Sequence, residues 1–92
     1  MKAQLFGSAG MSLVALLAAC SGGGGPDCTT EPQSAWMSEA AMQQSIQRMG
    51  YKVNEFKISG NCYEIYGWDR EGRKVEVYFS PVNGEIVKSE IE

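Results

Sequence analysis

The sequence predicts an α+β domain, in which one amphipathic helix packs on a three- to four-stranded antiparallel sheet. Three observations predict this fold: a helical period over residues 36–50, a period of two in the segments that follow, and turn residues between those segments. The 92 residues leave room for one domain. A domain of this size buries a small core, which a disulfide or a metal often supplements.

The composition excludes several classes of function. Histidine is absent, which removes Ser-His and Cys-His catalysis and every zinc site that contains histidine. The chain has 8 Lys and Arg against 11 Asp and Glu and no basic stripe, so we expect no nucleic-acid partner. We also expect no cofactor, no metal and no catalytic residue. A small enzyme is the third alternative, and it would require a strongly shifted carboxylate in a cleft.

Residues 1–19 have the zones of an export signal. Met1 and Lys2 supply positive charge, residues 5–19 form an apolar stretch, and small residues end it. The stretch is too short to span a membrane stably, since a transmembrane helix needs about 20 apolar residues. We interpret it as a signal peptide that is removed.

The end of this stretch, Leu17-Ala18-Ala19-Cys20, resembles a lipobox, the recognition sequence of bacterial lipoprotein processing. The resemblance implies that the Cys20 thiol receives diacylglycerol, that cleavage falls just before Cys20, and that the new amino group is acylated. More than one acyl chain is what stable anchoring requires. The alternative is ordinary secretion, with cleavage after Ser21 and an incidental Cys20.

The lipoprotein interpretation divides the chain into a signal peptide (1–19), a lipidated Cys with a glycine-rich tether (20–27) and a folded domain (28–92). It predicts an exported protein that is anchored to the membrane through its N-terminal lipid and faces the periplasm. Ser21 is not Asp, which by analogy with lipoprotein sorting favours the outer membrane in a host with two membranes.

Two cysteines remain once Cys20 carries lipid. In an oxidising compartment, Cys28 and Cys62 are expected to form a disulfide. Closing a loop of about 35 residues would stabilise the domain by roughly 4 kcal/mol. The alternative is a redox-active or metal-binding pair, which lacks CxxC spacing and a histidine partner.

The helix is predicted over residues 36–50. Ser38 is a plausible N-cap, and Gly50 sits where a left-handed residue ends a helix. The apolar side chains recur at helical spacing in Met42, Ile46 and Met49, with Ala41 and Ser45 alongside. This stripe is expected to lie in the core, and its alternative is an adaptable methionine surface.

After Gly50 the period changes to two. Strands are expected at 51–59, 62–68, 74–79 and 85–91, with turns at 60–61, 69–72 and 80–84. The first strand changes phase, which predicts a bulge near Asn54 and Glu55. The last is expected at the sheet edge, where Val87 and Ile91 can point inward.

The hairpin sequence fixes the register of the two middle strands. A three-residue loop with Gly72 left-handed pairs Asp69 with Arg73. Side chains that alternate along these strands then share one face, expected under the helix: Tyr63, Ile65, Val75, Val77 and Phe79.

The opposite face contains three aromatic residues, Tyr66, Trp68 and Tyr78, among Glu64, Lys74 and Glu76. Aromatics surrounded by charges are typical of the centre of a protein interface, so these three form a candidate binding face. The alternative is that the rings only stabilise the sheet, through cross-strand pairs of Trp68 with Lys74 and Tyr78 with Glu64.

Three segments give the chain a resemblance to the PepSY domain family. Gly50-Tyr51-Lys52-Val53 opens the sheet, residues 69–78 form the central hairpin, and residues 80–87 look like the end motif of the family. In that motif Ser80 replaces the usual Asp and Asn83 the usual Thr. The match covers most of residues 28–92.

The resemblance implies a non-enzymatic, envelope-anchored binding module, since PepSY domains occur in the propeptides of thermolysin-like metalloproteases and as free-standing exported domains for which inhibition or restraint of proteases has been proposed. Its partner would be a protease or another envelope protein. No catalytic residues carry over. The alternative is a structural or envelope-stress accessory lipoprotein without a discrete ligand.

Overall fold

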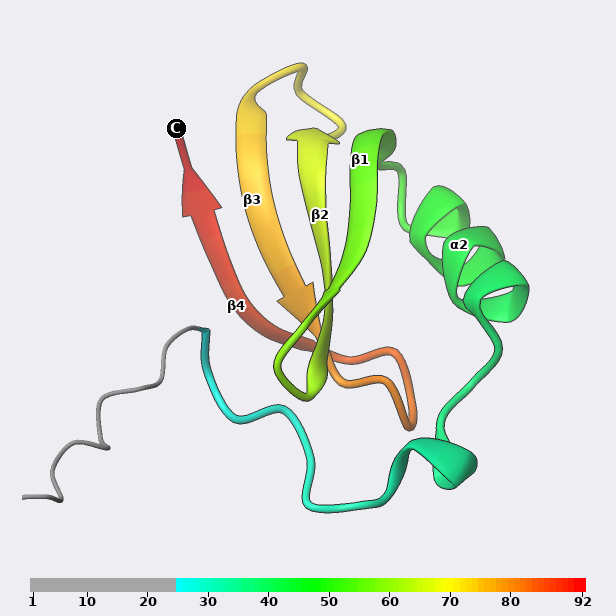
Figure 1. The fold of residues 1–92 in the computed structure, drawn as a ribbon. Coiled ribbons are helices and arrows are strands. Elements are labelled where there is room, and N and C mark those ends of the chain that lie inside the picture. Colours follow the sequence, from blue (N-terminus) through cyan, green and yellow to red (C-terminus); the bar gives the residue numbers. More distant parts are fainter. Residues whose placement is uncertain (1–24) are drawn as a thin grey trace, which may run out of the picture.

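The computed structural model describes residues 25–92, so the predicted signal peptide (1–19) and Cys20 lie outside the described residues. The described elements are η1 (Gln33–Ala35), α2 (Glu39–Arg48), β1 (Lys52–Ser59), β2 (Cys62–Trp68), β3 (Lys74–Phe79) and β4 (Ile86–Ile91). The strands form a four-stranded antiparallel sheet in the order β1-β2-β3-β4, with α2 against one face (Figure 1). The predicted α+β fold is confirmed.

Helix α2 has the ends that the sequence predicts. The Ser38 side chain accepts a hydrogen bond of 3.1 Å from the backbone N–H of Ala41, which satisfies one N–H of the first turn. Gly50 follows the helix with φ 97°, a conformation that L side chains rarely adopt. The inward stripe is Met42 and Ile46, both fully buried.

The register of the middle strands is also as predicted. Tyr63 lies opposite Phe79 and Ile65 opposite Val77. In the hairpin loop, Gly72 has φ 81° and the backbone N–H of Asp69 donates to the carbonyl of Arg73. The ladder between β1 and β2 shifts register between Val53 and Glu55, which confirms the predicted bulge.

The core lies between α2 and one sheet face. It contains the predicted residues of β2 and β3 together with the helix stripe: Met42, Ile46, Tyr63, Ile65, Val75, Val77 and Phe79. Burying these side chains stabilises the fold by about 25 cal/mol for each Å² of apolar surface removed from water. The face that α2 covers is therefore the one the sequence indicates.

Strand β4 lies at the sheet edge as predicted, and Ile91 lies opposite Val75 on the helix side. Val87 and Ile91 are nevertheless 41% and 60% exposed. A helix of ten residues is only about 15 Å long. Helix α2 lies toward β1 in Figure 1, and the core cluster contains no residue of β4. The helix is too short to cover the fourth strand.

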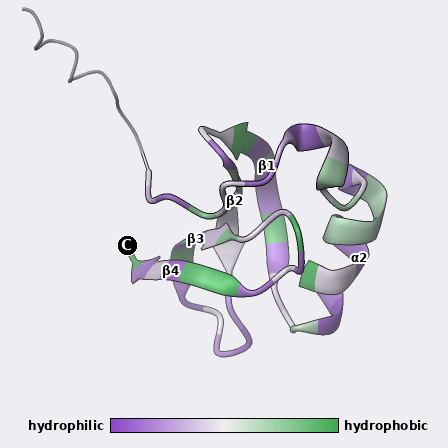
Figure 2. Ribbon diagram, turned by 90° about the horizontal axis from the view of Figure 1, so that it is seen from below, coloured by the Kyte–Doolittle hydropathy of each residue, from purple (hydrophilic) through white to green (hydrophobic). Residues whose placement is uncertain are grey.

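The N-terminal part of the described chain crosses the other face of the sheet. Cys28 and Cys62 form a disulfide with Cα atoms 5.2 Å apart. Asn61 reinforces this junction, because its side chain accepts from the Cys28 N–H at 2.8 Å and donates to the Thr29 carbonyl at 2.8 Å. Figure 2 shows the chain entering on the side of the sheet away from α2.

Candidate functional site

The structure places the three predicted aromatics together on the sheet face away from α2, called here the outer face. Tyr66 and Trp68 project from β2 and Tyr78 from β3, and each is partly exposed. Tyr66 lies opposite Glu76, while Trp68 lies opposite Lys74. The aromatics therefore share one face with the charged residues that the sequence analysis assigned to it.

Two of these aromatics converge on one carboxylate. The Tyr66 hydroxyl donates to Glu76 Oε2 at 3.1 Å, and the Tyr78 hydroxyl donates to the same oxygen at 2.8 Å. The hydrogen bond to Glu76 raises the pKa of Tyr66 to about 12 and also raises the pKa of Tyr78. Both hydroxyls stay protonated at neutral pH and act as donors.

Glu64 completes this cluster from β2. Glu64 is only 2% exposed, and within residues 25–92 no group forms a hydrogen bond with its Oε2 atom. Burial raises the pKa of Glu64, and a hydrogen bond with Glu76 raises it further. The pKa of Glu76 is lowered, chiefly by that bond and by the one from Tyr78. The two neighbouring carboxyl groups are thus shifted in opposite directions, Glu64 toward its neutral form and Glu76 toward its charged form.

Sequence reasoning missed this cluster, although the sequence contains a signal for it. The tripeptides Glu64-Ile65-Tyr66 and Glu76-Val77-Tyr78 are both Glu-x-Tyr, and they pair antiparallel so that each Glu faces the Tyr of the other strand. This crosswise pairing gathers two carboxyl groups and two hydroxyls on one face.

The outer face also carries every lysine of residues 25–92. These are Lys52, Lys57, Lys74 and Lys88, placed by their pairing with Trp68, Glu64, Trp68 and Tyr78. Lys57 Nζ lies 5.4 Å from the centre of the Tyr66 ring, and Lys52 Nζ lies 5.9 Å from that of Trp68. This acidic protein thus concentrates its ammonium groups beside its partly exposed aromatics.

The entering chain covers part of this face. A Cβ atom on Gly25 would lie 2.6 Å from the Tyr78 ring, so the backbone packs directly on that ring. The carbonyl oxygen of Pro26 lies 3.1 Å from Cys62 Sγ, a disulfide sulfur that has no proton to donate. Tyr78 is therefore enclosed on one side, and the accessible part of the candidate binding face is centred on Tyr66 and Trp68.

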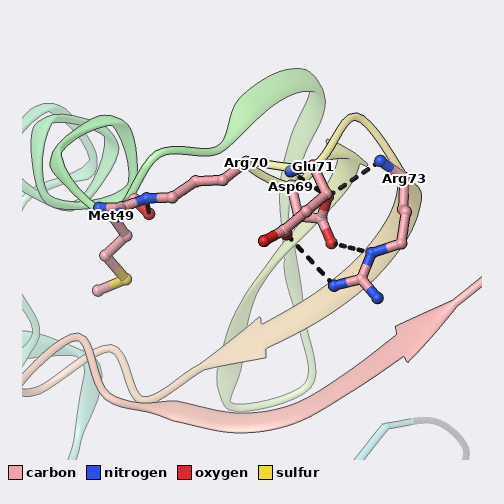
Figure 3. Close-up of polar contacts among 5 residues, drawn as sticks. All are labelled: Met49, Asp69, Arg70, Glu71 and Arg73. Atoms are coloured by element: carbon pink, nitrogen blue, oxygen red, sulfur yellow. Dashed lines mark hydrogen bonds and ion pairs between the residues drawn. The ribbon is translucent and has the colours of Figure 1, made fainter.

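A concave region lies on the helix side of the sheet, away from the candidate binding face. The β2–β3 hairpin is ordered by Asp69, which accepts from the Arg73 guanidinium at 2.8 Å, and by Arg70, which donates to the Met49 carbonyl at 3.0 Å (Figure 3). The hollow beside it measures about 320 Å³ and is lined by Met49, Tyr51, Asp69, Arg70, Glu71, Arg73, Val75, Ser89 and Ile91.

The charged side chains that line this hollow stabilise the hairpin through bonds to one another and to the backbone. Desolvation opposes ionisation of Asp69, but the hydrogen bonds and charge of Arg73 outweigh it and lower the pKa of Asp69. Glu64, whose pKa is raised, does not line the hollow.

Within residues 25–92, no three His, Cys, Asp or Glu side chains lie close enough together to bind a metal ion. In the same residues no helix is long and apolar enough to cross a membrane.

The Glu64→Gln variant is expected to gain stability relative to the native protein as pH rises from 5 to 8. In the unfolded chain Glu64 loses its proton near pH 4.5, whereas burial raises its pKa in the folded protein, so ionisation increasingly favours unfolding as the pH rises above 4.5. Glutamine has nearly the same shape and carries no titrating proton. The measurement is the denaturant midpoint of both proteins against pH.

The matched control is Glu55→Gln, which removes one carboxylate from an exposed position on the same face. It corrects for the general effect of changing net charge. A constant difference between Glu64→Gln and the native protein from pH 5 to 8 would show that Glu64 is ionised in the folded state.

Comparison with known proteins identifies the family. The chain matches the family model described as peptidase propeptide and YPEB domain over residues 8–90. Domains of this kind are of propeptide or inhibitory type and are generally non-catalytic. Searches of curated proteins and of solved structures found no match. The match covers far more than half of the chain, and it agrees with the helix-on-sheet fold: this protein belongs to the peptidase propeptide and YPEB domain family, the PepSY family.

Proposed function

We propose that this chain is a non-enzymatic, envelope-anchored module that binds a protease and inhibits or restrains it. The match to a peptidase-propeptide family is the observation that carries this proposal. The absence of histidine from the whole sequence supports a binding role over a catalytic one.

The binding surface in this proposal is the outer face around Tyr66 and Trp68. Partly exposed Tyr and Trp side chains are enriched at interface centres, where they supply large contact areas at little entropic cost. The neighbouring lysines favour a partner with an acidic surface, since complementary charge speeds association and selects partners.

Anchoring through Cys20 is part of the same proposal. The lipobox resemblance places the acylated residue five positions before Gly25, and an extended chain of that length spans at most about 18 Å. The chain enters the domain on the outer face, so the tether holds that face near the membrane. The protein would then face the periplasm, on the outer membrane if the host has two.

The second candidate is a structural or envelope-stress accessory protein without a discrete ligand. The hydrogen bonds of Tyr66 and Tyr78 to Glu76 favour it, because they give both hydroxyls an intramolecular role. The aromatics would then stabilise the sheet and bind nothing.

The double variant Tyr66→Ser with Trp68→Ser is expected to lose protease capture and inhibition, with at most a few degrees' change in melting temperature. The bait is the full chain purified from membranes, measured against envelope proteases in an inhibition assay. Gln43→Ser with Gln44→Ser, exposed on α2, is the matched control. A Cys20→Ser bait, expected in the soluble fraction, separates anchoring from binding.

Inhibition that survives in the folded double variant would contradict the proposed face. A melting temperature lowered by many degrees would instead support the accessory role of the aromatics. Because Tyr66→Ser also removes a bond to Glu76, the single variant Trp68→Ser, which keeps the Tyr66 hydroxyl, tests the contribution of the partly exposed indole alone.

A further inference from the structure

Strand β4 leaves an open edge on the described sheet. It pairs with β3 on one side, and the strand order β1-β2-β3-β4 places no strand of residues 25–92 on its other side. Of the four exposed large apolar side chains in the described part of the chain, three belong to this strand: Ile86, Val87 and Ile91. The opposite edge, β1, is interrupted by a bulge, which hinders pairing with another chain.

The hydrogen-bond pattern shows which backbone groups of β4 face outward. The Glu92 N–H donates to the Lys74 carbonyl at 2.9 Å, so Glu92 belongs to a hydrogen-bonded pair with β3. Such pairs alternate along an antiparallel ladder, which directs Glu90 and Lys88 toward β3 as well. The N–H and C=O groups of Ser89 and Ile91 therefore point to the open edge.

A second copy of β4 can pair antiparallel with this edge so that opposite charges face each other. With a twofold axis at Ser89, the outward groups of the two Ser89 residues face each other and form a hydrogen-bonded pair. Lys88 then lies opposite Glu90 of the other copy, twice, and Val87 lies opposite Ile91. An axis at Lys88 or at Glu90 would instead place two like charges directly opposite, which destabilises a sheet.

We propose that this protein forms a symmetric dimer by antiparallel pairing of β4 with β4 about Ser89. The pairing joins two four-stranded sheets into one continuous sheet. It brings Val87 of each copy beside Ile91 of the other, next to the hollow that Val75, Ser89 and Ile91 line and that α2 leaves uncovered.

The dimer goes beyond the proposed function and does not depend on it. Lys88 and Glu90 lie on the outer face, since Lys88 pairs with Tyr78 and Glu90 with Glu76. The outer faces of the two copies therefore become one surface, with a Tyr66–Trp68 patch on each half.

Sedimentation equilibrium of the secreted Cys20→Ser chain, from about 10 μM to 1 mM, tests the proposal. The native edge is expected to give a dimer. Lys88→Glu and Glu90→Lys should each weaken dimerisation at least tenfold, because each places like charges opposite. The double variant Lys88→Glu with Glu90→Lys restores unlike pairs and should restore the dimer, and an equimolar mixture of the two single variants should form a heterodimer.

The control is Lys52→Glu, the same charge change on β1, which should leave the dimer unaffected. The Lys88–Glu90 ion pair within one chain, at 3.3 Å, is broken by either single variant, but both side chains are exposed and the pair contributes little to folding. A monomer at 1 mM overturns the proposal. So does a dimer that the single variants leave intact, or a double variant that stays monomeric.

Discussion

Loss of the Cys28–Cys62 disulfide is expected to lower the free energy of unfolding by about 4 kcal/mol. The two residues are 34 positions apart, and the bond restricts the unfolded chain far more than the folded one. A domain of this size loses about 4 to 8 °C in melting temperature per kcal/mol, so the Cys28→Ser, Cys62→Ser variant should melt about 15 to 30 °C lower.

Thermal unfolding followed by circular dichroism measures this effect. Because Cys62 is fully buried, the serine variant also buries a hydroxyl, which has its own cost. The melting temperature of the native protein is therefore also measured with and without reductant, which breaks the bond without a substitution. The Cys20→Ser chain, which retains the bond, is the control. If reduction changes the melting temperature by less than about 5 °C, the bond contributes little to stability.

The second large effect is expected from Gly67→Ala. Gly67 lies in β2 between Val53 and Val75, where β1 comes close at its bulge. A Cβ atom there would overlap the carbonyl oxygen of Lys52, a backbone atom that cannot rotate away. Inserting one carbon into packed structure typically costs 1 to 3 kcal/mol, and we expect about 3 kcal/mol here because a strand must move.

Gly72→Ala is the control for Gly67→Ala. Gly72 has φ 81° but open space around its Cα, so alanine there meets only the backbone penalty of about 1 to 2 kcal/mol. Denaturant unfolding of both variants compares steric with conformational cost. A Gly67→Ala protein as stable as Gly72→Ala or more so would show that β1 adjusts easily.

Local rules predicted most of the fold. Ser38, Gly50 and Gly72 each have a conformational or capping role that short-range chemistry determines. Asp69 and Gly72 set the hairpin, and the hairpin sets which side chains of β2 and β3 face the helix. The candidate aromatics were placed on a common face by the same register.

Features that depend on distant segments could not be predicted in this way. The burial of Glu64 depends on its neighbours on two other strands, Lys57 of β1 and Tyr78 of β3, which lie opposite it. The exposure of Ile91 depends on how far α2 reaches across the sheet. The alternation of side chains along a single strand determines neither of these exposures. The proposed anchoring at Cys20 concerns residues outside the described part of the chain.

The disulfide also closes residues 28–62 into a covalent ring that contains η1, α2 and β1. Residues 30–35, within the ring, are exposed and form the kind of segment that proteases cut first. One cut in residues 30–35 leaves the two fragments joined by the sulfur bridge, and all four strands stay together in the C-terminal fragment. The domain can thus be nicked once by a protease in this segment without separating into two pieces.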